Sequence, residues 1–291
     1  MSNGRIAELS RRGVVAVSGA EAEKFLNDVI TCDVPKTGEA AAYGGLLTPQ
    51  GKILFDFIVF KDGGRYLFDL PRAFIADFTR RLTFYRLRAK VDVADLSEDH
   101  TVVAAWGSDA APILDGRVAP DPRLAALGFR AITPGGGDMA PDFTEVREAD
   151  YDRHRIALGM PEGDIDFGYG DAFPHDAAMD QLGGVDFAKG CYVGQEVVSR
   201  MEHRGTARRR FVIATGSPPL PAAGTLVTAG DKTIGTMGSS DGGTGLALVR
   251  LDRAKQAMDA GVAIVAGDAT LSLTLPAWAK YRWPEAGTEG E

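Results

Sequence analysis

Apolar and polar residues alternate in short runs through the first part of the chain, and these runs predict both strands and helices. Residues 14–18 form a β-branched run that predicts a strand. Residues 19–30 carry acids in their first turn and apolar side chains on one side, which is typical of a helix. Turn residues separate the next strand-like runs and predict an antiparallel meander over residues 43–48, 53–60 and 65–70.

Helical periodicity begins after this meander. Pro71 opens a run in which apolar residues recur at helical spacing, at Phe74, Ile75, Phe78, Leu82 and Tyr85. Strands are expected to follow over residues 90–93 and 101–106. A sheet backed by helices is an α+β arrangement.

The second half of the chain has a different pattern. Thr144 is a candidate cap for a helix over residues 145–158, and residues 164–184 are expected to form a polar loop. Beyond residue 205, short runs between glycines predict a small antiparallel barrel or sandwich, with strands at residues 209–214, 225–228, 233–237, 245–249, 262–265 and 271–275.

Length and composition are those of a globular protein with more than one domain. The chain has 291 residues, more than one hydrophobic core usually holds, so two or three domains are expected. Hydrophobic residues make up 45% of the chain and charged residues 25%, which is close to the globular average. The change of pattern places a domain boundary near residue 205.

Neither a membrane segment nor a bound metal is expected. The longest apolar run, residues 53–60, contains Asp56 and falls short of the ~18 residues that span a bilayer. The N-terminal residues lack the apolar core of a secretory signal and include Glu8, so a cytoplasmic location is expected. Two cysteines, Cys32 and Cys191, and four scattered histidines form neither a disulfide framework nor a metal-ligand pattern, so no permanently bound metal is expected.

Charge and motifs exclude several classes of function. The net charge of −8 argues against direct nucleic-acid binding by the whole surface. The chain contains no phosphate-binding loop, nucleophile elbow or dinucleotide fingerprint, so phosphotransfer and the usual hydrolase chemistry lose their main support.

Basic residues nevertheless concentrate in two segments. Each segment is either a solvated face balanced by acids elsewhere in space or an anion-binding concavity. The first contains Arg80, Arg81, Arg86, Arg88 and Lys90, and the second contains Arg200, Arg204, Arg208, Arg209 and Arg210.

Cys191 is the candidate catalytic residue. It stands just before residues 193–201, which can form a helix, and Lys189 is close in sequence. A thiol at a helix N-terminus near a lysine is expected to hold more thiolate than an isolated one. The alternative is a small buried apolar side chain, but the polar flanking residues favour a functional role.

Three residues after Cys191 have the chemistry of a pterin-binding site. Gln195 and Glu196 offer an amide and a carboxylate, which match the paired donors and acceptors of a pterin ring, and Tyr192 would stack on such a ring. The alternatives are that Gln195 and Glu196 only cap a helix and that Tyr192 only packs.

Asp56 interrupts an apolar strand. By alternation, Asp56 shares a face with Leu54, Ile58 and Phe60, where a carboxylate is costly to bury unless it is paired or faces a cavity. It is therefore expected either to line a ligand site or to lie exposed at a strand edge. Arg153 and Arg155 are expected to be surface residues or partners of such acids.

Residues 189–196, with the sequence Lys-Gly-Cys-Tyr-Val-Gly-Gln-Glu, resemble the signature of the YgfZ-type proteins. These proteins form a bacterial and mitochondrial group related to the T-protein of the glycine cleavage system. Residues 17–27, 47–56 and 155–161 are similar to weaker motifs of the same superfamily, in the same order. The resemblance covers most of the chain and is loose beyond residue 210.

The resemblance implies a multi-lobed, GcvT-like α+β fold. Three lobes would form a ring with folate bound in its central channel, and the last lobe would be an antiparallel β-barrel. The implied folate-binding region covers residues 1–204, with a first lobe of residues 1–47 and 116–204 around a second lobe of residues 48–115. The implied barrel covers residues 205–285.

The resemblance also implies a function. The family is implicated in a tetrahydrofolate-dependent assembly or repair of iron-sulfur clusters, chiefly four-iron clusters, which supports tRNA-modifying enzymes. A tetrahydrofolate-binding accessory protein is therefore expected, with the cluster assembly machinery and its client proteins as partners. Cys191 occupies the family's cysteine position, and the candidate folate-binding residues are Asp56, Lys189, Tyr192, Gln195, Glu196, Arg200 and Arg204.

Two other functions stay open. Asp56 matches the position of an acid near the folate in T-proteins, so a tetrahydrofolate-dependent aminomethyltransferase is one alternative, although T-proteins generally lack the segment at residues 189–196. A module that docks RNA or protein through residues 200–210 is the other. The chain has His175 where relatives commonly have glutamate, and this leaves the role of His175 open.

Overall fold

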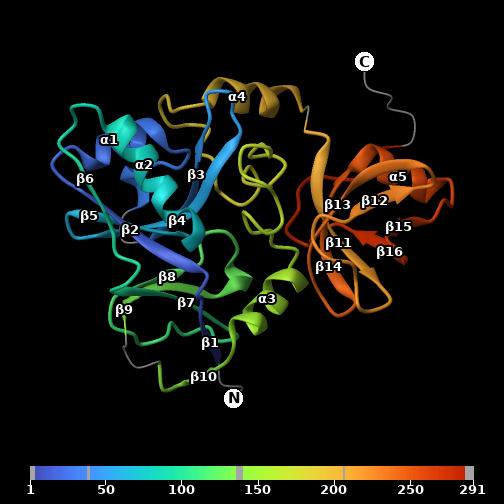
Figure 1. The fold of residues 1–291 in the computed structure, drawn as a ribbon, viewed down its shortest axis with the longest axis horizontal. Coiled ribbons are helices and arrows are strands. Elements are labelled where there is room, and N and C mark those ends of the chain that lie inside the picture. Colours follow the sequence, from blue (N-terminus) through green and yellow to red (C-terminus); the bar gives the residue numbers. More distant parts are fainter. Residues whose placement is uncertain (1–3, 38–39, 136–139, 206, 286–291) are drawn as a thin grey trace. The chain divides into compact units, whose positions relative to one another are not determined.

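The computed structural model describes residues 4–37, 40–135, 140–205 and 207–285. The chain divides into two compact units (Figure 1). The first unit is Met1–Tyr151 with Leu182–Val197, and the second is Asp152–Gln181 with Val198–Glu291. No helix in the described ranges is long and apolar enough to cross a membrane. The predicted domain boundaries at residues 47, 115 and 204 stay predictions, because compact units need not coincide with domains.

One sheet of the first unit has five strands in the order β3-β4-β5-β2-β6. All neighbouring strands in this sheet are antiparallel. The predicted meander is confirmed, because β3, β4 and β5 are consecutive neighbours. The strands are β2 (Arg12–Ser18), β3 (Ala41–Leu47), β4 (Ile53–Asp62), β5 (Arg65–Pro71) and β6 (Asp92–Asp95).

The other sheet of the first unit has the order β10-β1-β7-β9-β8. The prediction that Thr144 caps a helix is wrong, since Thr144 lies in β10 opposite Arg5, where the N-terminal strand pairs with it in parallel. The helix α3 (Glu148–Ala157) begins only after this strand. The strands are β1 (Gly4–Glu8), β7 (His100–Trp106), β8 (Arg117–Pro120), β9 (Phe129–Pro134) and β10 (Phe143–Glu145).

The sheet that contains β4 packs aromatic side chains on one face and carries Asp56 on the other. On the aromatic face, Phe55, Phe57 and Phe68 pack against Phe78 of α2 (Ile75–Arg86), with ring centroids 5.4, 5.7 and 5.4 Å from that of Phe78. The predicted alternation along β4 is confirmed, because the opposite face carries Asp56. Tight burial of the phenylalanines on α2 therefore fixes Asp56 on the other side of the sheet.

Short helices complete the first unit. The helix α1 (Ala22–Val29) buries Phe25, Leu26 and Val29, as its apolar stripe predicts. Three 3₁₀ turns lie in the same unit, at η1 (Pro35–Thr37), η2 (Arg72–Phe74) and η3 (Ala125–Leu127).

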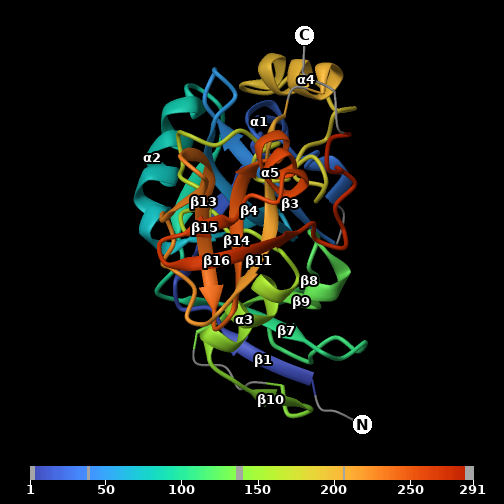
Figure 2. The same ribbon diagram turned by 90° about the vertical axis from the view of Figure 1, so that its right-hand side faces the viewer.

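A closed antiparallel barrel forms most of the second unit (Figure 2). Its core includes Val212, Val227, Ile234 and Val249. All the strands predicted beyond residue 205 are confirmed, and the barrel rather than the sandwich is present. The strands are β11 (Arg209–Gly216), β12 (Leu226–Ala229), β13 (Lys232–Asp241), β14 (Thr244–Arg250), β15 (Ile264–Ala266) and β16 (Ala269–Thr274).

Two helices complete this part of the chain. The helix α5 (Leu251–Asp259), which no pattern in the sequence predicted, buries Leu251, Ala254 and Ala257 against the barrel core. The helix α4 (Gln195–Arg204) crosses the division between the two units, since Val197 ends one segment of the first unit and Val198 begins a segment of the second.

Candidate functional site

A buried lysine anchors the segment that contains Cys191. The side chain of Lys189 is 7% exposed, and its Nζ donates hydrogen bonds to the backbone carbonyls of Ile30 and Cys32, both at 2.7 Å. Burial lowers the pKa of Lys189 from its ordinary value. Asp186 Oδ1 accepts hydrogen bonds from the backbone N–H groups of Ala188 and Lys189, at 2.8 and 3.0 Å. Both sets of hydrogen bonds anchor the backbone just before Cys191.

Thr31 connects this segment to the sheet. The hydroxyl of Thr31 donates to the carbonyl of Gly184 at 2.5 Å and accepts from the backbone N–H of Gly45 at 2.8 Å. The backbone carbonyl of Thr31 accepts from Asp186 N–H at 3.0 Å. Gly45 of β3 stands opposite Asp56 of β4. The segment that leads to Cys191 is thus hydrogen-bonded through Thr31 to β3, the strand next to the one that carries Asp56.

Cys191 is exposed to solvent, so the alternative of a buried apolar side chain is wrong. The prediction that Cys191 stands at a helix N-terminus is also wrong, because α4 begins only at Gln195 after a turn that contains Gly194. A Cβ on Gly194, whose φ is +83°, would lie 2.5 Å from the carbonyl oxygen of Thr48. The positive φ and this close approach together require glycine at position 194.

The other cysteine is in a different environment. Cys32 is 4% exposed, and burial raises the pKa of its thiol to about 12. Its Sγ lies 2.6 Å from the position that a Cβ on Gly44 would take. Cys32 is therefore a packed, protonated thiol, and of the two cysteines it is Cys191 that is exposed.

Tyr192 offers a buried hydroxyl beside Cys191. The side chain is 6% exposed, and the Lys189 ammonium lies 5.4 Å from the centroid of its ring. Burial raises the pKa of Tyr192 to about 12. Within the described residues, the hydroxyl has no hydrogen-bond partner. Since an unsatisfied buried hydroxyl is costly, a ligand with a polar group at this point would fit.

The remaining residues predicted near Cys191 lie on α4 or at its start. The Gln195 side-chain amide donates to the carbonyl of Gly190 at 3.5 Å, which closes the loop around Cys191. Glu196, Arg200 and Arg204 are exposed on the helix. The structure therefore brings Lys189, Tyr192 and Gln195 together. Arg200 and Arg204 belong to the second unit.

Asp56 is buried in the middle of a sheet, so the alternative of exposure at a strand edge is wrong. It is 3% exposed, and β4 has a neighbouring strand on each side. The Tyr43 hydroxyl donates to Asp56 Oδ2 at 3.1 Å. Burial and the carboxylate of Asp56 raise the pKa of Tyr43 well above its ordinary value. The pair is a hydrogen-bonded acid and phenol inside the first unit.

Sequence reasoning missed a cluster of buried charges in the first unit. Arg12 Nε donates to Asp69 Oδ1 at 2.5 Å, and Arg123 holds Asp121 with two hydrogen bonds at 2.9 and 2.7 Å. Arg130 Nη1 lies 3.5 Å from Asp69 Oδ2. Asp69 interrupts the apolar run of β5 just as Asp56 interrupts β4, and this was the available signal.

Three residues of the second unit could in principle hold a cation. Ligand atoms of His175, Asp180 and Glu202 lie within 4.8 Å of one another. However, Arg210 donates to both oxygens of Asp180, at 2.6 and 3.0 Å, and a guanidinium so close opposes a bound cation. His175 Nε2 lies 3.0 Å from Glu202 Oε2. The backbone carbonyl of His175 accepts a hydrogen bond from the Arg210 guanidinium. His175 therefore links α4 to β11 through hydrogen bonds.

The second basic segment is partly balanced by acids. Arg209 pairs with Asp176 at 2.6 Å and Arg210 pairs with Asp180 at 2.6 Å. For these two arginines, the alternative of balance by acids elsewhere in space is confirmed.

Two family models match the chain. The GCVT N-terminal domain matches residues 2–141, and the CAF17 C-terminal beta-barrel domain matches residues 208–281. Over 98% of this chain and 88% of the other, the structure superposes on the glycine cleavage system aminomethyltransferase T from Bartonella henselae, with a TM-score of 0.72 and 17% identity. These likenesses confirm a GcvT-like α+β fold with a C-terminal antiparallel barrel.

Several relatives carry one name, that of the mitochondrial iron-sulfur cluster assembly factor IBA57. The Pyricularia oryzae homologue is 33% identical over 278 residues, which cover 84% of this chain and 71% of the relative. The human protein is 29% identical over 309 residues, which cover 95% and 84%. The Mycosarcoma maydis homologue is 33% identical over 75% of this chain, which spans 60% of that relative's length.

These relatives correct one prediction and identify the family. The expected cytoplasmic location is contradicted, because the relatives are named as mitochondrial proteins. That expectation was a default drawn from a missing secretory signal, and such an absence specifies no compartment. The identity and coverage of the Pyricularia oryzae homologue show that the chain belongs to the IBA57 family of iron-sulfur cluster assembly factors.

Proposed function

We propose that this chain is a tetrahydrofolate-binding accessory protein, of the YgfZ type, for the assembly or repair of iron-sulfur clusters. One observation carries the proposal: Cys191 is exposed on a backbone that the buried Lys189 anchors. The names of the relatives support a role with clusters. The partners would be the cluster assembly machinery and its client proteins, among them tRNA-modifying enzymes.

In this proposal the cluster is a substrate, and Cys191 supplies one of its ligands. A four-iron cluster takes four thiolate ligands, so the others must come from a partner, a second chain or a small thiol. Cys32 is too deeply buried to contribute. An exposed thiol on an anchored loop suits such a shared and transient contact.

Tetrahydrofolate would bind the first unit through groups that fit a pterin. The Tyr192 hydroxyl has no hydrogen-bond partner within the described residues, and Asp56, which accepts from the Tyr43 hydroxyl, offers a buried carboxylate. Gln195 and Glu196, which belong to the same unit, would add polar contacts. When bound, the folate would supply a carrier for one-carbon units. The likeness to an aminomethyltransferase extends to the fold alone, so we do not propose that reaction.

Replacing Cys191 by serine is expected to abolish the function in cells. The measurement is the activity of a four-iron enzyme in cells that lack this protein and express the parent, Cys191→Ser or Cys32→Ala. The parent and Cys32→Ala should restore activity, whereas Cys191→Ser, equally abundant, should leave it at the level of the empty vector. Full restoration by Cys191→Ser would remove this cysteine from the mechanism.

A further inference from the structure

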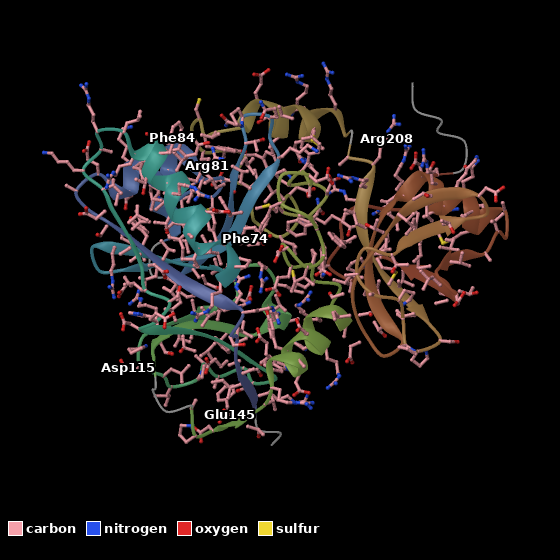
Figure 3. The ribbon with its side chains drawn as sticks, viewed as in Figure 1. Phe74, Arg81, Phe84, Asp115, Glu145 and Arg208 are labelled. Atoms are coloured by element: carbon pink, nitrogen blue, oxygen red, sulfur yellow. The ribbon has the colours of Figure 1, made fainter. Side chains whose placement is uncertain are left out.

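The C-terminal end of α2 exposes two large apolar side chains. Phe84 is 69% exposed and Leu87 is 86% exposed, whereas Phe78 and Leu82 of the same helix are buried. Figure 3 shows Phe84 and Arg81 on this helix. Phe84 lies in the last turn of α2, and Leu87 is the first residue after the helix. Together they form a small apolar patch on the first unit.

The backbone of Leu87 is in a conformation that favours glycine. Its φ is 49° and its ψ is −103°, and the N–H of Ala89 donates to the carbonyl of Arg86 at 2.8 Å. These are the features of a type II′ turn with Leu87 at its first central position, where glycine dominates. A leucine here adds backbone strain and exposes apolar surface to water. A strained and exposed apolar residue of this kind points to a contact with another molecule.

The patch has a cationic rim. The side chains of Arg81, Arg88 and Lys90 are exposed and form no ion pair with any described residue. Arg81 instead lies over the ring of Tyr85, at 6.0 Å. Residues 80–90 contain no acid, although the whole chain carries a net charge of −8. Local positive charge on an acidic protein attracts an acidic partner without attracting polyanions to the rest of the surface.

We propose that the α2 surface, formed by Arg81, Phe84, Leu87, Arg88 and Lys90, docks an acidic segment of a partner protein that carries an apolar anchor. Phe84 and Leu87 cover the anchor, and the cationic side chains pair with carboxylates around it. A nucleic-acid backbone would use the cations but not the leucine. A bilayer would need a longer apolar face, and the net charge would oppose anionic lipids. This proposal does not depend on folate or on Cys191.

The test uses fluorescence anisotropy with a short labelled peptide, in which leucine and phenylalanine at helical spacing are flanked by glutamates. The parent should bind it, and Phe84→Ser should weaken binding by about tenfold, the loss typical of a central anchor. Arg81→Glu with Arg88→Glu should weaken binding and flatten its salt dependence. Ile113→Ser is the matched control, because Ile113 is 81% exposed between Asp109 and Asp115 and should not affect binding.

A second variant separates binding from folding. Leu87→Gly removes the anchor but suits the backbone, so its Tm should equal or exceed that of the parent while its binding is about tenfold weaker. The proposal is overturned if the parent does not bind the peptide or if these variants bind as the parent does. It is also overturned if phosphatidylserine vesicles or an RNA oligonucleotide bind more tightly than the peptide, with the same sensitivity to Phe84→Ser.

Discussion

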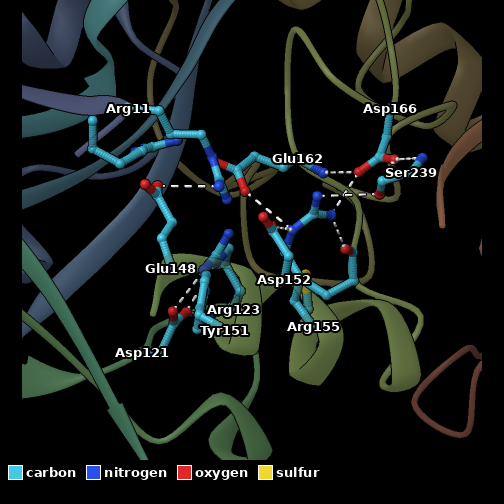
Figure 4. Close-up of polar contacts among 12 residues, drawn as sticks. Arg11, Asp121, Arg123, Glu148, Tyr151, Asp152, Arg155, Glu162, Asp166 and Ser239 are labelled. Atoms are coloured by element: carbon cyan, nitrogen blue, oxygen red, sulfur yellow. Dashed lines mark hydrogen bonds and ion pairs between the residues drawn. The ribbon is translucent and has the colours of Figure 1, made fainter. Parts of the chain in front are cut away.

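Replacing Arg155 by alanine is expected to lower the free energy of unfolding by about 3–5 kcal/mol. Arg155 is 1% exposed, and its guanidinium lies 2.7 Å from Asp166, 2.8 Å from Asp152 and 3.2 Å from Glu162 (Figure 4). Asp166 and Glu162 are themselves buried. The alanine variant removes a cation from beside buried carboxylates in a region of low dielectric, and this accounts for the expected loss.

The same arginine links three parts of the second unit. It comes from α3, donates to the carbonyl of Met160 at 3.2 Å and donates to the hydroxyl of Ser239 on β13 at 3.1 Å. Asp166 Oδ1 in turn accepts from the Ser239 N–H and hydroxyl, both at 2.6 Å. Loss of Arg155 therefore also weakens the contact between the loop that carries Asp166 and the barrel strand that carries Ser239.

Urea denaturation of the parent and two variants measures the effect. The matched control is Arg153→Ala, because Arg153 lies in the same helix but is 52% exposed and pairs with the 42% exposed Asp241 at 2.7 Å. An exposed pair of this kind contributes no more than about 1 kcal/mol. Similar losses of unfolding free energy in Arg155→Ala and Arg153→Ala would contradict the view that burial of the ion pair decides how much its removal destabilises the fold.

Replacing Lys189 by methionine is expected to lower the free energy of unfolding by about 2–4 kcal/mol. The substitution keeps an unbranched side chain but removes the donor to two buried carbonyls, those of Ile30 and Cys32. Lys36→Met is the control, since Lys36 is 62% exposed and pairs with Asp186 of the same segment at 2.8 Å. Thermal denaturation should show a large loss for Lys189→Met and a small one for Lys36→Met.

The stability difference between the parent and Lys189→Met should also depend on pH. Burial lowers the pKa of Lys189 in the folded state, so between that lowered value and the ordinary value of about 10.4 the unfolded chain binds more protons. Within this window, Lys189 makes the free energy of unfolding of the parent rise with pH. This contribution disappears as the pH falls below the pKa of Lys189 in the folded state. Lys189→Met lacks this contribution, so the difference in free energy of unfolding between the parent and Lys189→Met should grow toward alkaline pH. A deficit independent of pH would contradict the burial of the ammonium.

The sequence predicted elements that rest on local periodicity. The alternation in β4 correctly separated Phe55 and Phe57 from Asp56, because burial of one face forces the register. Short strands between glycines correctly indicated the barrel. The prediction failed at Thr144, where a strand distant in the chain supplies the backbone partner. Local propensity cannot report such a pairing.

The candidate site was predicted in part. The residue types at 189–196 pointed to the exposed cysteine and to the polar residues around it. They did not show that Lys189 donates to the carbonyls of Ile30 and Cys32, more than a hundred residues away in sequence. The charged pair of Arg12 and Asp69 was missed for the same reason, because only the fold brings the two together.

Anaerobic calorimetric titration with tetrahydrofolate tests the central claim most directly. The parent should bind with a micromolar Kd, Asp56→Asn should bind at least about tenfold more weakly, and Asp115→Asn, at an exposed acid of the same unit, should bind as the parent does. Absence of binding by the parent, or equal affinity in Asp56→Asn, would contradict a folate site built on Asp56.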